Sequence, residues 1–382
     1  MIPYGRQSID RKDIEAVRKV LASDFITQGP AIAKFERAVA DTCGAKYAVA
    51  VSSGTAALHL AAIVAGLGPG DEAITTPITF LATANCILYT GAKPVFADID
   101  ESTVNLDPKS FEQSISKRTK AVLPVDFGGL PAAMEEIRRI AKRRNLVVIE
   151  DASHALGAAY PKGKVGSCLY SDMTIFSFHP VKHITTGEGG CITTNNQKFY
   201  EKLKSLRSHG VYRSEKVQEK EGGWYYEMEE VGFNYRITDF QCALGLSQLQ
   251  KIDSFVAARS ARVENYNRAF ASLSDHLMLP AQKIEGQKHA WHLYLIRLRD
   301  PRGGKKRRRL YDFLKKNGVH AQVHYIPVYR QPYYRQLFDG RKTHCPNAER
   351  YYEQALSLPL YPDLREREQK QVIRLVKDFF QA

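Results

Sequence analysis

The first two thirds of the chain alternate between short apolar segments typical of strands and segments in which apolar residues recur at helical spacing. The strand-like segments are nearly continuous apolar runs, as in strands that are buried on both faces. They are Tyr47–Val51, Glu72–Thr76, Pro94–Asp98, Lys120–Val125, Leu146–Glu150, Met173–Phe178 and Gly190–Thr194. Helical patterns lie between several of them, at residues 54–65, 80–88 and 132–144. This order predicts an α/β domain with a mostly parallel central sheet and right-handed crossovers.

The last third of the chain has a different pattern. Helix-forming residues dominate from Thr238 to about Leu273, which predicts a long connecting helix. A strand-like segment at His292–Ile296, a basic helix near Arg308–Lys316 and an amphipathic helix at Arg367–Phe380 follow. We therefore predict three parts: an N-terminal arm and helix (residues 1–30), a large α/β domain (31–245) and a smaller C-terminal α+β domain (246–382).

The composition is that of an ordinary globular protein. The 382 residues are 44% apolar and 25% charged, which leaves ample apolar surface to bury. The longest nearly apolar stretch, residues 56–68, is too short to span a bilayer, and the N-terminus lacks the apolar core of a signal peptide. The six cysteines form no CxxC pair, so neither a zinc site nor a redox pair is indicated. We expect a soluble, cytoplasmic protein with reduced cysteines and no metal.

An excess of basic residues gives the chain a net charge of +14. Such a charge can serve nucleic acid, a membrane surface or an anionic substrate. The excess is spread along the sequence, with one dense run at Lys305–Arg309. We interpret this run as a solvated face or an exposed loop.

Small and polar residues follow the first strand. In α/β sheets a ligand lies beyond the carboxyl ends of the strands, so residues at these positions are candidates for chemistry. After Val51 the chain reads Ser52-Ser53-Gly54-Thr55 and enters a helix. The free N–H groups of this helix N-terminus could hold a phosphate, with the Thr55 hydroxyl as a further donor. A simple helix N-cap would explain the same residues, so both interpretations stay open here.

An acid and a lysine follow two later strands. Asp151 comes after a buried strand, where a carboxylate needs a cationic partner such as a protonated ring nitrogen. The alternative is that Asp151 caps a helix. Lys182 lies in a turn rich in aromatic, Pro and Gly residues, where a lysine loses its proton more easily than on the surface. Phe80 could stack on a ring or belong to the core. A phosphate turn, an acid and a Schiff-base lysine are the parts that hold pyridoxal 5′-phosphate (PLP).

Several motifs occur in a fixed order along the chain. They are Ile26–Pro30 (ITQGP), Ser53–Leu58 (SGTAAL), Glu150–Gly157 (EDASHALG), Ser177–Lys182 (SFHPVK), Gly187–Gly190 (GEGG) and Gly232–Arg236 (GFNYR). Together they resemble the sugar aminotransferases of the DegT/DnrJ/StrS family, from Tyr4 to about Pro362. The resemblance implies the α/β architecture of PLP-dependent aminotransferases of fold type I.

The resemblance also implies roles for individual residues. Lys182 would bind PLP as a Schiff base and move the proton, while Asp151 would pair with the pyridine nitrogen. The other implied cofactor contacts are Gly54, Thr55 and Ser177 at the phosphate, Phe80 on the ring face and His154 near the ring hydroxyl. Asn234 would reach the phosphate from a partner subunit, which implies a homodimer with shared active sites. The alternative for Asn234 is to cap the helix that begins near Thr238.

The same resemblance implies the substrates. L-glutamate would be the amino donor and a UDP-linked keto-sugar the acceptor. Through runs such as residues 75–85 and 321–327, the chain is particularly similar to transaminases of the pseudaminic acid pathway, which act on a 4-keto-6-deoxy UDP-N-acetyl-sugar. Tyr4, His324 and Tyr325 would approach the nucleotide-sugar. The segment Trp224–Tyr226 is either a mobile cover of the site or a core-facing loop.

Other interpretations stay open. In the run at residues 125–130, many relatives carry His in place of Asp126 or Gln in place of Gly129. The main alternative is therefore a transaminase for another nucleotide-linked 3- or 4-keto sugar, such as one of the perosamine or 4-amino-arabinose type. A family dehydratase has His instead of the Schiff-base lysine, but here Lys182 occupies that place. A regulatory or nucleic-acid-binding relative would have no need of Lys182, Asp151 and Ser177 together. We therefore expect an enzyme with no nucleic-acid or membrane partner.

Overall fold

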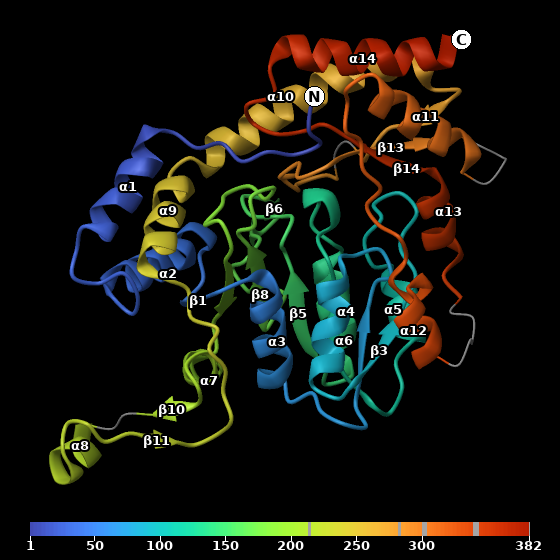
Figure 1. Cartoon of the computed structure of the whole chain (residues 1–382). Coiled ribbons are helices and arrows are strands. Elements are labelled where there is room, and N and C mark those ends of the chain that lie inside the picture. Colours follow the sequence, from blue (N-terminus) through green and yellow to red (C-terminus); the bar gives the residue numbers. More distant parts are fainter. Residues whose placement is uncertain (213–214, 282–283, 300–303, 339–343, 382) are drawn as a thin grey trace.

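A seven-stranded sheet forms the centre of the computed structural model, which describes residues 1–212, 215–281, 284–299, 304–338 and 344–381 (Figure 1). The strand order is β1-β9-β8-β5-β4-β2-β3. The strands are β1 (Tyr47–Val51), β2 (Glu72–Thr75), β3 (Lys93–Phe96), β4 (Thr119–Leu123), β5 (Val147–Asp151), β8 (Met173–Ser177) and β9 (Gly190–Thr194). β9 is antiparallel to both of its neighbours, and the other strands share one direction. The predicted mostly parallel sheet is confirmed.

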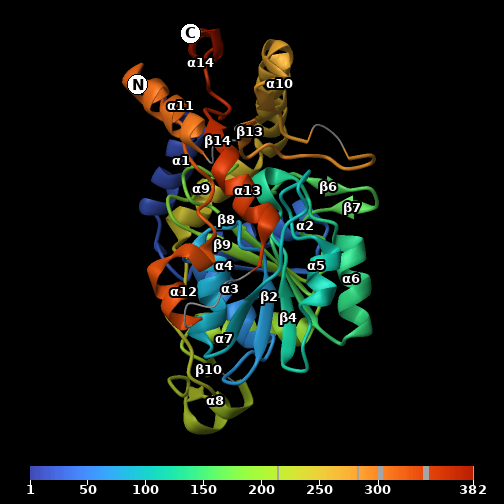
Figure 2. The ribbon, with the colours of Figure 1, turned by 90° about the vertical axis from the view of Figure 1, so that its right-hand side faces the viewer.

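Helices cover both faces of this sheet (Figure 2). One face carries α2 (Pro30–Cys43), α5 (Pro108–Gln113) and α6 (Met134–Arg143), and the other carries α3 (Gly54–Val64), α4 (Leu81–Tyr89) and α7 (Gln197–Arg207). Successive side chains of a strand point to opposite faces. In β5, Val148 packs with the first layer and Ile149 with the second. The same alternation sends Glu150 and Asp151 to opposite faces of the sheet.

Two helices replace the single long helix predicted from Thr238. α9 (Asp239–Leu249) ends before Lys251, and α10 (Ile252–Phe270) begins after it. Lys251 Nζ lies 2.6 Å from the carboxylate of Asp13, which is fully buried in the N-terminal helix α1 (Arg11–Leu21). This ion pair holds the break between the two helices against α1. The prediction of one long helix was wrong here, because Lys251 at the break pairs with Asp13, which is distant in the sequence.

The C-terminal part has its own antiparallel sheet and apolar core. Its elements are β12 (Leu277–Met278), β13 (Tyr294–Leu298), β14 (Ala355–Leu358), α11 (Lys305–Lys316), α12 (Pro332–Leu337), α13 (Pro346–Gln354) and α14 (Glu366–Gln381). The core surrounds Tyr266 and Tyr294, and Ile2 from the N-terminus joins it. The basic run begins α11, where Lys305, Arg308 and Arg309 are exposed, as predicted for a solvated face, and Lys306 and Arg307 are half-buried. The domain boundaries at residues 30 and 245 stay a prediction.

A narrow hairpin projects from the body of the molecule (Figure 1). It consists of β10 (Val211–Tyr212), α8 (Glu215–Glu221) and β11 (Glu227–Met228), and a second small hairpin, β6 (Ala159–Tyr160) and β7 (Gly163–Lys164), lies elsewhere. Trp224 is 81% exposed and Tyr226 is 59% exposed. A core-facing position for the segment Trp224–Tyr226 is therefore wrong.

Two further expectations can be compared with the structure. The six cysteines are free thiols, five of them buried and Cys168 half-buried. Along the described ranges, none of the helices combines the length and the apolarity needed to cross a membrane. The cytoplasmic location stays a prediction.

Candidate active site

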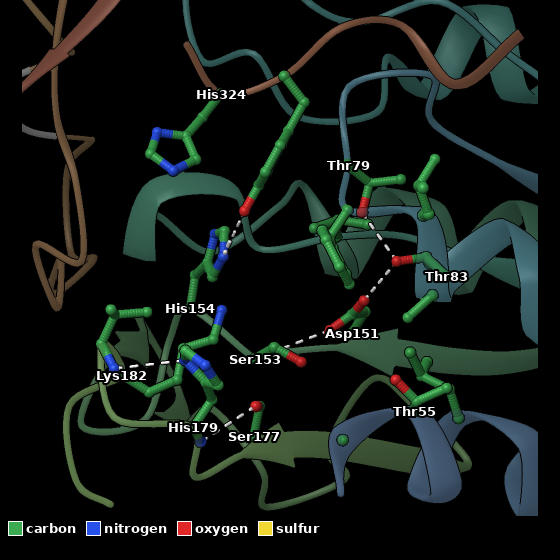
Figure 3. A pocket seen from close by; sticks show the side chains of 18 of the residues that line it. Thr55, Thr79, Thr83, Asp151, Ser153, His154, Ser177, His179, Lys182 and His324 are labelled. Carbon is green, nitrogen blue, oxygen red and sulfur yellow. Dashed lines mark hydrogen bonds between the residues drawn. The ribbon is translucent and has the colours of Figure 1, made fainter. Parts of the chain in front are cut away.

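A cavity of about 690 Å³ lies beyond the carboxyl ends of the parallel strands (Figure 3). Segments that follow β1, β2, β4, β5 and β8 form most of its wall, and residues 322–326 of the C-terminal part complete it. The predicted site residues that line it are Tyr4, Gly54, Thr55, Phe80, Asp151, His154, Ser177, Lys182, His324 and Tyr325. The topology thus brings together residues that the sequence separates widely.

The turn after β1 leaves backbone amides that could hold an anion. Ser53 is the N-cap of α3, since its Oγ accepts a hydrogen bond of 3.0 Å from the Ala56 N–H. The amides of Gly54 and Thr55, at the first two positions of α3, have no acceptor within the helix. A Cβ on Gly54 would lie 2.9 Å from the Cβ of Ser177, so glycine is what lets the two turns approach. The Ser53 N-cap and an anion site at the two amides are therefore compatible, because different residues would provide them.

Asp151 ends β5 and is 4% exposed. Its Oδ2 accepts a hydrogen bond of 2.7 Å from Thr83 Oγ1, and its Oδ1 accepts one of 3.1 Å from the Ser153 N–H. Thr83 Oγ1 in turn lies 2.8 Å from Thr79 Oγ1 (Figure 3). No lysine or arginine forms a salt bridge with Asp151 in the described part of the chain. The carboxylate bonds to its own turn rather than capping a helix, so the capping alternative is wrong.

Lys182 follows β8 in a turn that its own backbone closes, because the Lys182 N–H donates to the His179 carbonyl at 2.8 Å. Burial lowers the pKa of the Lys182 ammonium to about 8, and the nearby Asp151 carboxylate opposes this effect. A substantial fraction of the amine is therefore neutral in mildly alkaline solution. A neutral amine is the form that attacks an aldehyde.

Aromatic and imidazole rings form the opposite wall of the cavity. Phe80 is 58% exposed at the start of α4, so the core interpretation is wrong, and its ring centroid lies 6.2 Å from that of Tyr325. The His324 Nδ1 lies 2.7 Å from Ser357 Oγ, and the Tyr4 ring is 5.4 Å from the His324 ring. Burial lowers the pKa of His324 to about 3, so this ring is neutral.

Asn234 lies outside the cavity of its own chain. It is exposed and pairs with Ser208 in an isolated β-bridge. α9 is capped instead by Thr238, in a reciprocal capping box with Gln241. The capping alternative for Asn234 is therefore wrong. Its contact with a cofactor phosphate of a partner subunit stays a prediction.

The sequence analysis missed the hydroxyl chain Thr79–Thr83. Thr83 contacts Asp151 from α4, and both threonines are buried. No local pattern indicated this pair, because Thr79 precedes the N-cap of α4 and Thr83 lies in its first turn. The contact itself depends on how α4 packs on β5. Other polar residues of the wall that were not predicted are Ser53, Ser153, His179, Glu188, Gln322 and Gln331.

These residues fit PLP. The cradle at Gly54, Thr55 and Ser177 suits its phosphate, and Asp151 is a buried acid that forms no salt bridge with the described residues. Lys182 supplies an amine whose pKa burial has lowered. Within the described ranges, no group of three or more His, Cys, Asp or Glu side chains is arranged to hold a metal ion.

Comparison with known proteins agrees with this chemistry. The model of the DegT/DnrJ/EryC1/StrS aminotransferase family matches residues 7–377. The spore coat polysaccharide biosynthesis protein SpsC of Bacillus subtilis is 41% identical over 379 residues, which are 99% of this chain and 96% of that protein.

Solved structures are similar over nearly the full length. PseC of Helicobacter pylori, an aminotransferase involved in the biosynthesis of pseudoaminic acid, is 33% identical with a TM-score of 0.92, and the match covers 100% of this chain and 99% of that one. Spr1654 of Streptococcus pneumoniae, assigned as a sugar aminotransferase, is 30% identical in its PMP form with a TM-score of 0.93 and 99% of both chains covered. Its PLP form matches with a TM-score of 0.91. The chain therefore belongs to the DegT/DnrJ/EryC1/StrS family and is a PLP-dependent sugar aminotransferase.

Proposed function

We propose that the enzyme transfers the amino group of L-glutamate to carbon 4 of a 4-keto-6-deoxy UDP-N-acetyl-sugar. The product would be a UDP-4-amino-4,6-dideoxy sugar of the kind used for pseudaminic acid. The observation that carries most weight is the coexistence, in one cavity of about 690 Å³, of residues that fit PLP and a separate wall from the C-terminal part. The described function of the Helicobacter pylori relative supports the choice of sugar.

The residues around the reacting atoms have distinct tasks. When bound, PLP supplies an electron sink for the carbon that loses its proton. Lys182 would take up and return that proton, and its lowered pKa suits both directions. Asp151 provides the negative charge that keeps a ring nitrogen protonated, and Thr83 fixes the orientation of its carboxylate.

A second subunit would complete the site. Among the described residues that line the cavity, Lys182 is the only lysine or arginine, whereas the cofactor phosphate and a nucleotide diphosphate bring several negative charges. Asn234 lies exposed outside its own cavity, and the projecting hairpin carries Trp224 and Met228, 81% and 63% exposed. These features support a homodimer in which each chain contributes to the site of the other.

The substrate can be tested directly. The holoenzyme would be incubated with ¹⁵N-glutamate and a panel of nucleotide keto-sugars that differ in nucleotide, keto position and configuration. We expect ¹⁵N at carbon 4 of a UDP-linked 4,6-dideoxy-N-acetyl sugar, identified by mass spectrometry and NMR. Preferential amination of a sugar on another nucleotide, or at carbon 3, would favour the alternative substrates and overturn this proposal.

A further inference from the structure

The segment that returns from the projecting hairpin is held by its backbone on both sides of Asn234. The Phe233 N–H donates to the Leu206 carbonyl at 2.7 Å. The Tyr235 carbonyl accepts a hydrogen bond of 2.8 Å from the Ser52 N–H, in the turn between β1 and α3. The segment is therefore fixed to the same turn from which α3 begins.

Successive side chains of this segment point in opposite directions, as in an extended chain. Asn234 pairs with Ser208 in a β-bridge and is exposed, whereas Phe233 and Tyr235 are half-buried and pack on the apolar layer that contains α3. The two rings stack with their centroids 4.9 Å apart and their planes at 12°. The side chains that hold these two rings therefore also determine the side to which Asn234 points.

His59 of α3 contacts both rings. It is 7% exposed, and its ring centroid lies 4.9 Å from that of Phe233. Its Nδ1 lies 3.1 Å from the Tyr235 hydroxyl, which has no other hydrogen-bond partner among the described residues. The Tyr89 ring at the end of α4 packs on His59 from another direction, at 5.2 Å between centroids. His59 thus joins α3 to the segment by ring packing and by a hydrogen bond.

Helix α3 could serve either of two cofactor sites through His59. Its first turn carries the free amides of Gly54 and Thr55 in the chain's own cavity, and the Ser53 N-cap bond fixes that turn without His59. His59 itself does not line this cavity. Its closest ring contact and its hydrogen bond are made with the segment that carries Asn234. The contacts of His59 therefore point to the site that Asn234 serves.

We propose that His59 is a positioning residue for the cofactor site of the partner subunit. It holds Phe233 and Tyr235 in place, and these residues direct Asn234 outward, toward the phosphate bound in the other chain. This inference rests on the proposed shared site and deepens it, since it assigns the residue that orients the contribution of each chain. One helix then serves two sites, its own through the N-terminal amides and the partner's through His59.

The affinity for PLP tests the proposal without any substrate. Dissociation constants would be measured by titrating the full-length enzyme, freed of cofactor, with PLP. We expect Asn234→Ala and His59→Leu each to raise the dissociation constant by about tenfold or more, because a hydrogen bond to a charged phosphate is lost or misdirected. The double variant should bind PLP no more weakly than Asn234→Ala alone, because His59 acts through Asn234. Multiplied losses in the double variant would overturn the inference.

Mixed dimers show which subunit His59 serves. His59→Leu chains would be refolded with Lys182→Ala chains, and the mixed dimers isolated through two different affinity tags. Only the site that holds Lys182 gives the visible band of the bound cofactor, and in our proposal this site receives Asn234 from the Lys182→Ala chain. We expect its dissociation constant for PLP to return to within about twofold of the wild type. A constant that stays raised would place the effect of His59 in its own site and overturn the inference.

The same experiment with Asn234→Ala in place of His59→Leu separates this inference from the shared site. Binding that is restored with Asn234→Ala but not with His59→Leu would overturn the role of His59 alone. Binding that is restored in neither case would overturn the shared site and, with it, this inference. A wrong sugar would change none of these results, because neither amino donor nor acceptor is present.

Two further variants distinguish positioning from stability. Tyr235→Phe, which also serves if His59→Leu does not fold, keeps the rings and removes only the hydrogen bond to His59. It should raise the dissociation constant by about threefold and be restored in the same mixed dimers. The matched control Tyr200→Leu removes a ring that stacks on Tyr47 at 4.6 Å, at the opposite end of β1 from the segment. It should lower the melting temperature as His59→Leu does but leave the affinity for PLP unchanged. An equal loss of affinity in Tyr200→Leu would contradict the positioning role.

Discussion

At the scale of single residues, the chemistry depends on two buried side chains, the carboxylate of Asp151 and the amine of Lys182. Asp151 is nearly inaccessible and pairs with two hydrogen-bond donors but with no cation of the described chain. Lys182 has a pKa of about 8 because it is desolvated more strongly than the aspartate can offset. The acid therefore remains available to a ring nitrogen, and the amine remains available to an aldehyde.

Replacement of Asp151 by asparagine tests this arrangement. Asp151→Asn keeps the shape and the Thr83 contact but removes the charge that holds the ring nitrogen protonated. The rate of the glutamate half-reaction, followed by stopped-flow absorbance, should fall by at least about a hundredfold. The control Thr83→Val removes only the orienting hydroxyl and should cost much less. Near-normal rates in a correctly folded Asp151→Asn protein would show that another group keeps the ring nitrogen protonated.

At the scale of elements, the alternation in β5 creates a second acidic site behind the first. Glu150 points away from the cavity, and its Oε2 accepts a hydrogen bond from Thr174 Oγ1 at 2.7 Å. Its Oε1 and the Oδ2 of Asp126 are buried without a donor, and the two carboxyl groups are close enough to hydrogen-bond each other. Burial raises the pKa of both carboxyl groups, and the Glu150 charge raises that of Asp126 further, so Asp126 holds the proton that it shares with Glu150.

This pair makes stability depend on pH. At a pH above the ordinary carboxyl pKa, the unfolded chain has lost protons that the folded pair still holds. The free energy of unfolding therefore falls as the pH rises toward the raised pKa values of Asp126 and Glu150 in the folded protein. Asp126→Asn replaces the shared proton with an amide donor to Glu150. We expect little change at pH 5 and a gain of about 1 kcal/mol at pH 8, seen as a melting temperature about 1 °C higher. An equal loss of stability at both pH values would contradict the shared proton.

The basic first turn of α11 contributes to packing rather than to catalysis. Arg307 lies 4.8 Å from the centroid of the Tyr352 ring, and Lys306 lies 4.8 Å from that of Phe380. None of the residues of the run lines the cavity. Neutralising the exposed Lys305, Arg308 and Arg309 should leave kcat/KM for the UDP-sugar within about twofold, since surface charges contribute little. A large rise in KM would show that the run binds the diphosphate.

The elements differ in how far the sequence predicts them. Buried strands are recognisable because both faces must be apolar, and the topology of an α/β sheet then gathers Gly54, Asp151 and Lys182 at one edge. The direction of β9 could not be predicted, because an apolar strand reads the same in either direction. The break at Lys251 depends on Asp13, 238 positions away. The contact of Thr83 with Asp151 spans 68 positions and depends on helix packing, which local patterns do not encode.

At the scale of the whole molecule, the cavity is shared among parts of the chain that are distant in sequence and, in our proposal, between two chains. The N-terminal segment places Tyr4 in the wall, and the C-terminal part adds His324 and Tyr325. The hairpin and Asn234 lie outside this cavity. A shared site would explain why exposed apolar side chains occur on the hairpin.

Complementation tests the shared site. Lys182→Ala and Asn234→Asp homodimers should each be nearly inactive, the second because a carboxylate would face the cofactor phosphate. Refolding an equal mixture should give about half mixed dimers, each with one site that carries both defects and one that carries neither. About a quarter of the wild-type sites should then be active. If confirmed mixed dimers show no activity, both residues serve the same site and the proposal fails.

The most direct test of the account is a two-step measurement of the amino group on the enzyme. The holoenzyme would be mixed with L-glutamate alone, then freed of glutamate and mixed with a UDP-4-keto-6-deoxy-N-acetyl-sugar, while the visible absorption of the cofactor is recorded. We expect glutamate to abolish the visible band and the sugar to restore it, with one amino-sugar formed per site, and Lys182→Ala to show neither change. A band that glutamate bleaches but that no nucleotide-sugar restores would contradict the assigned substrate, and turnover by Lys182→Ala would contradict the assigned chemistry.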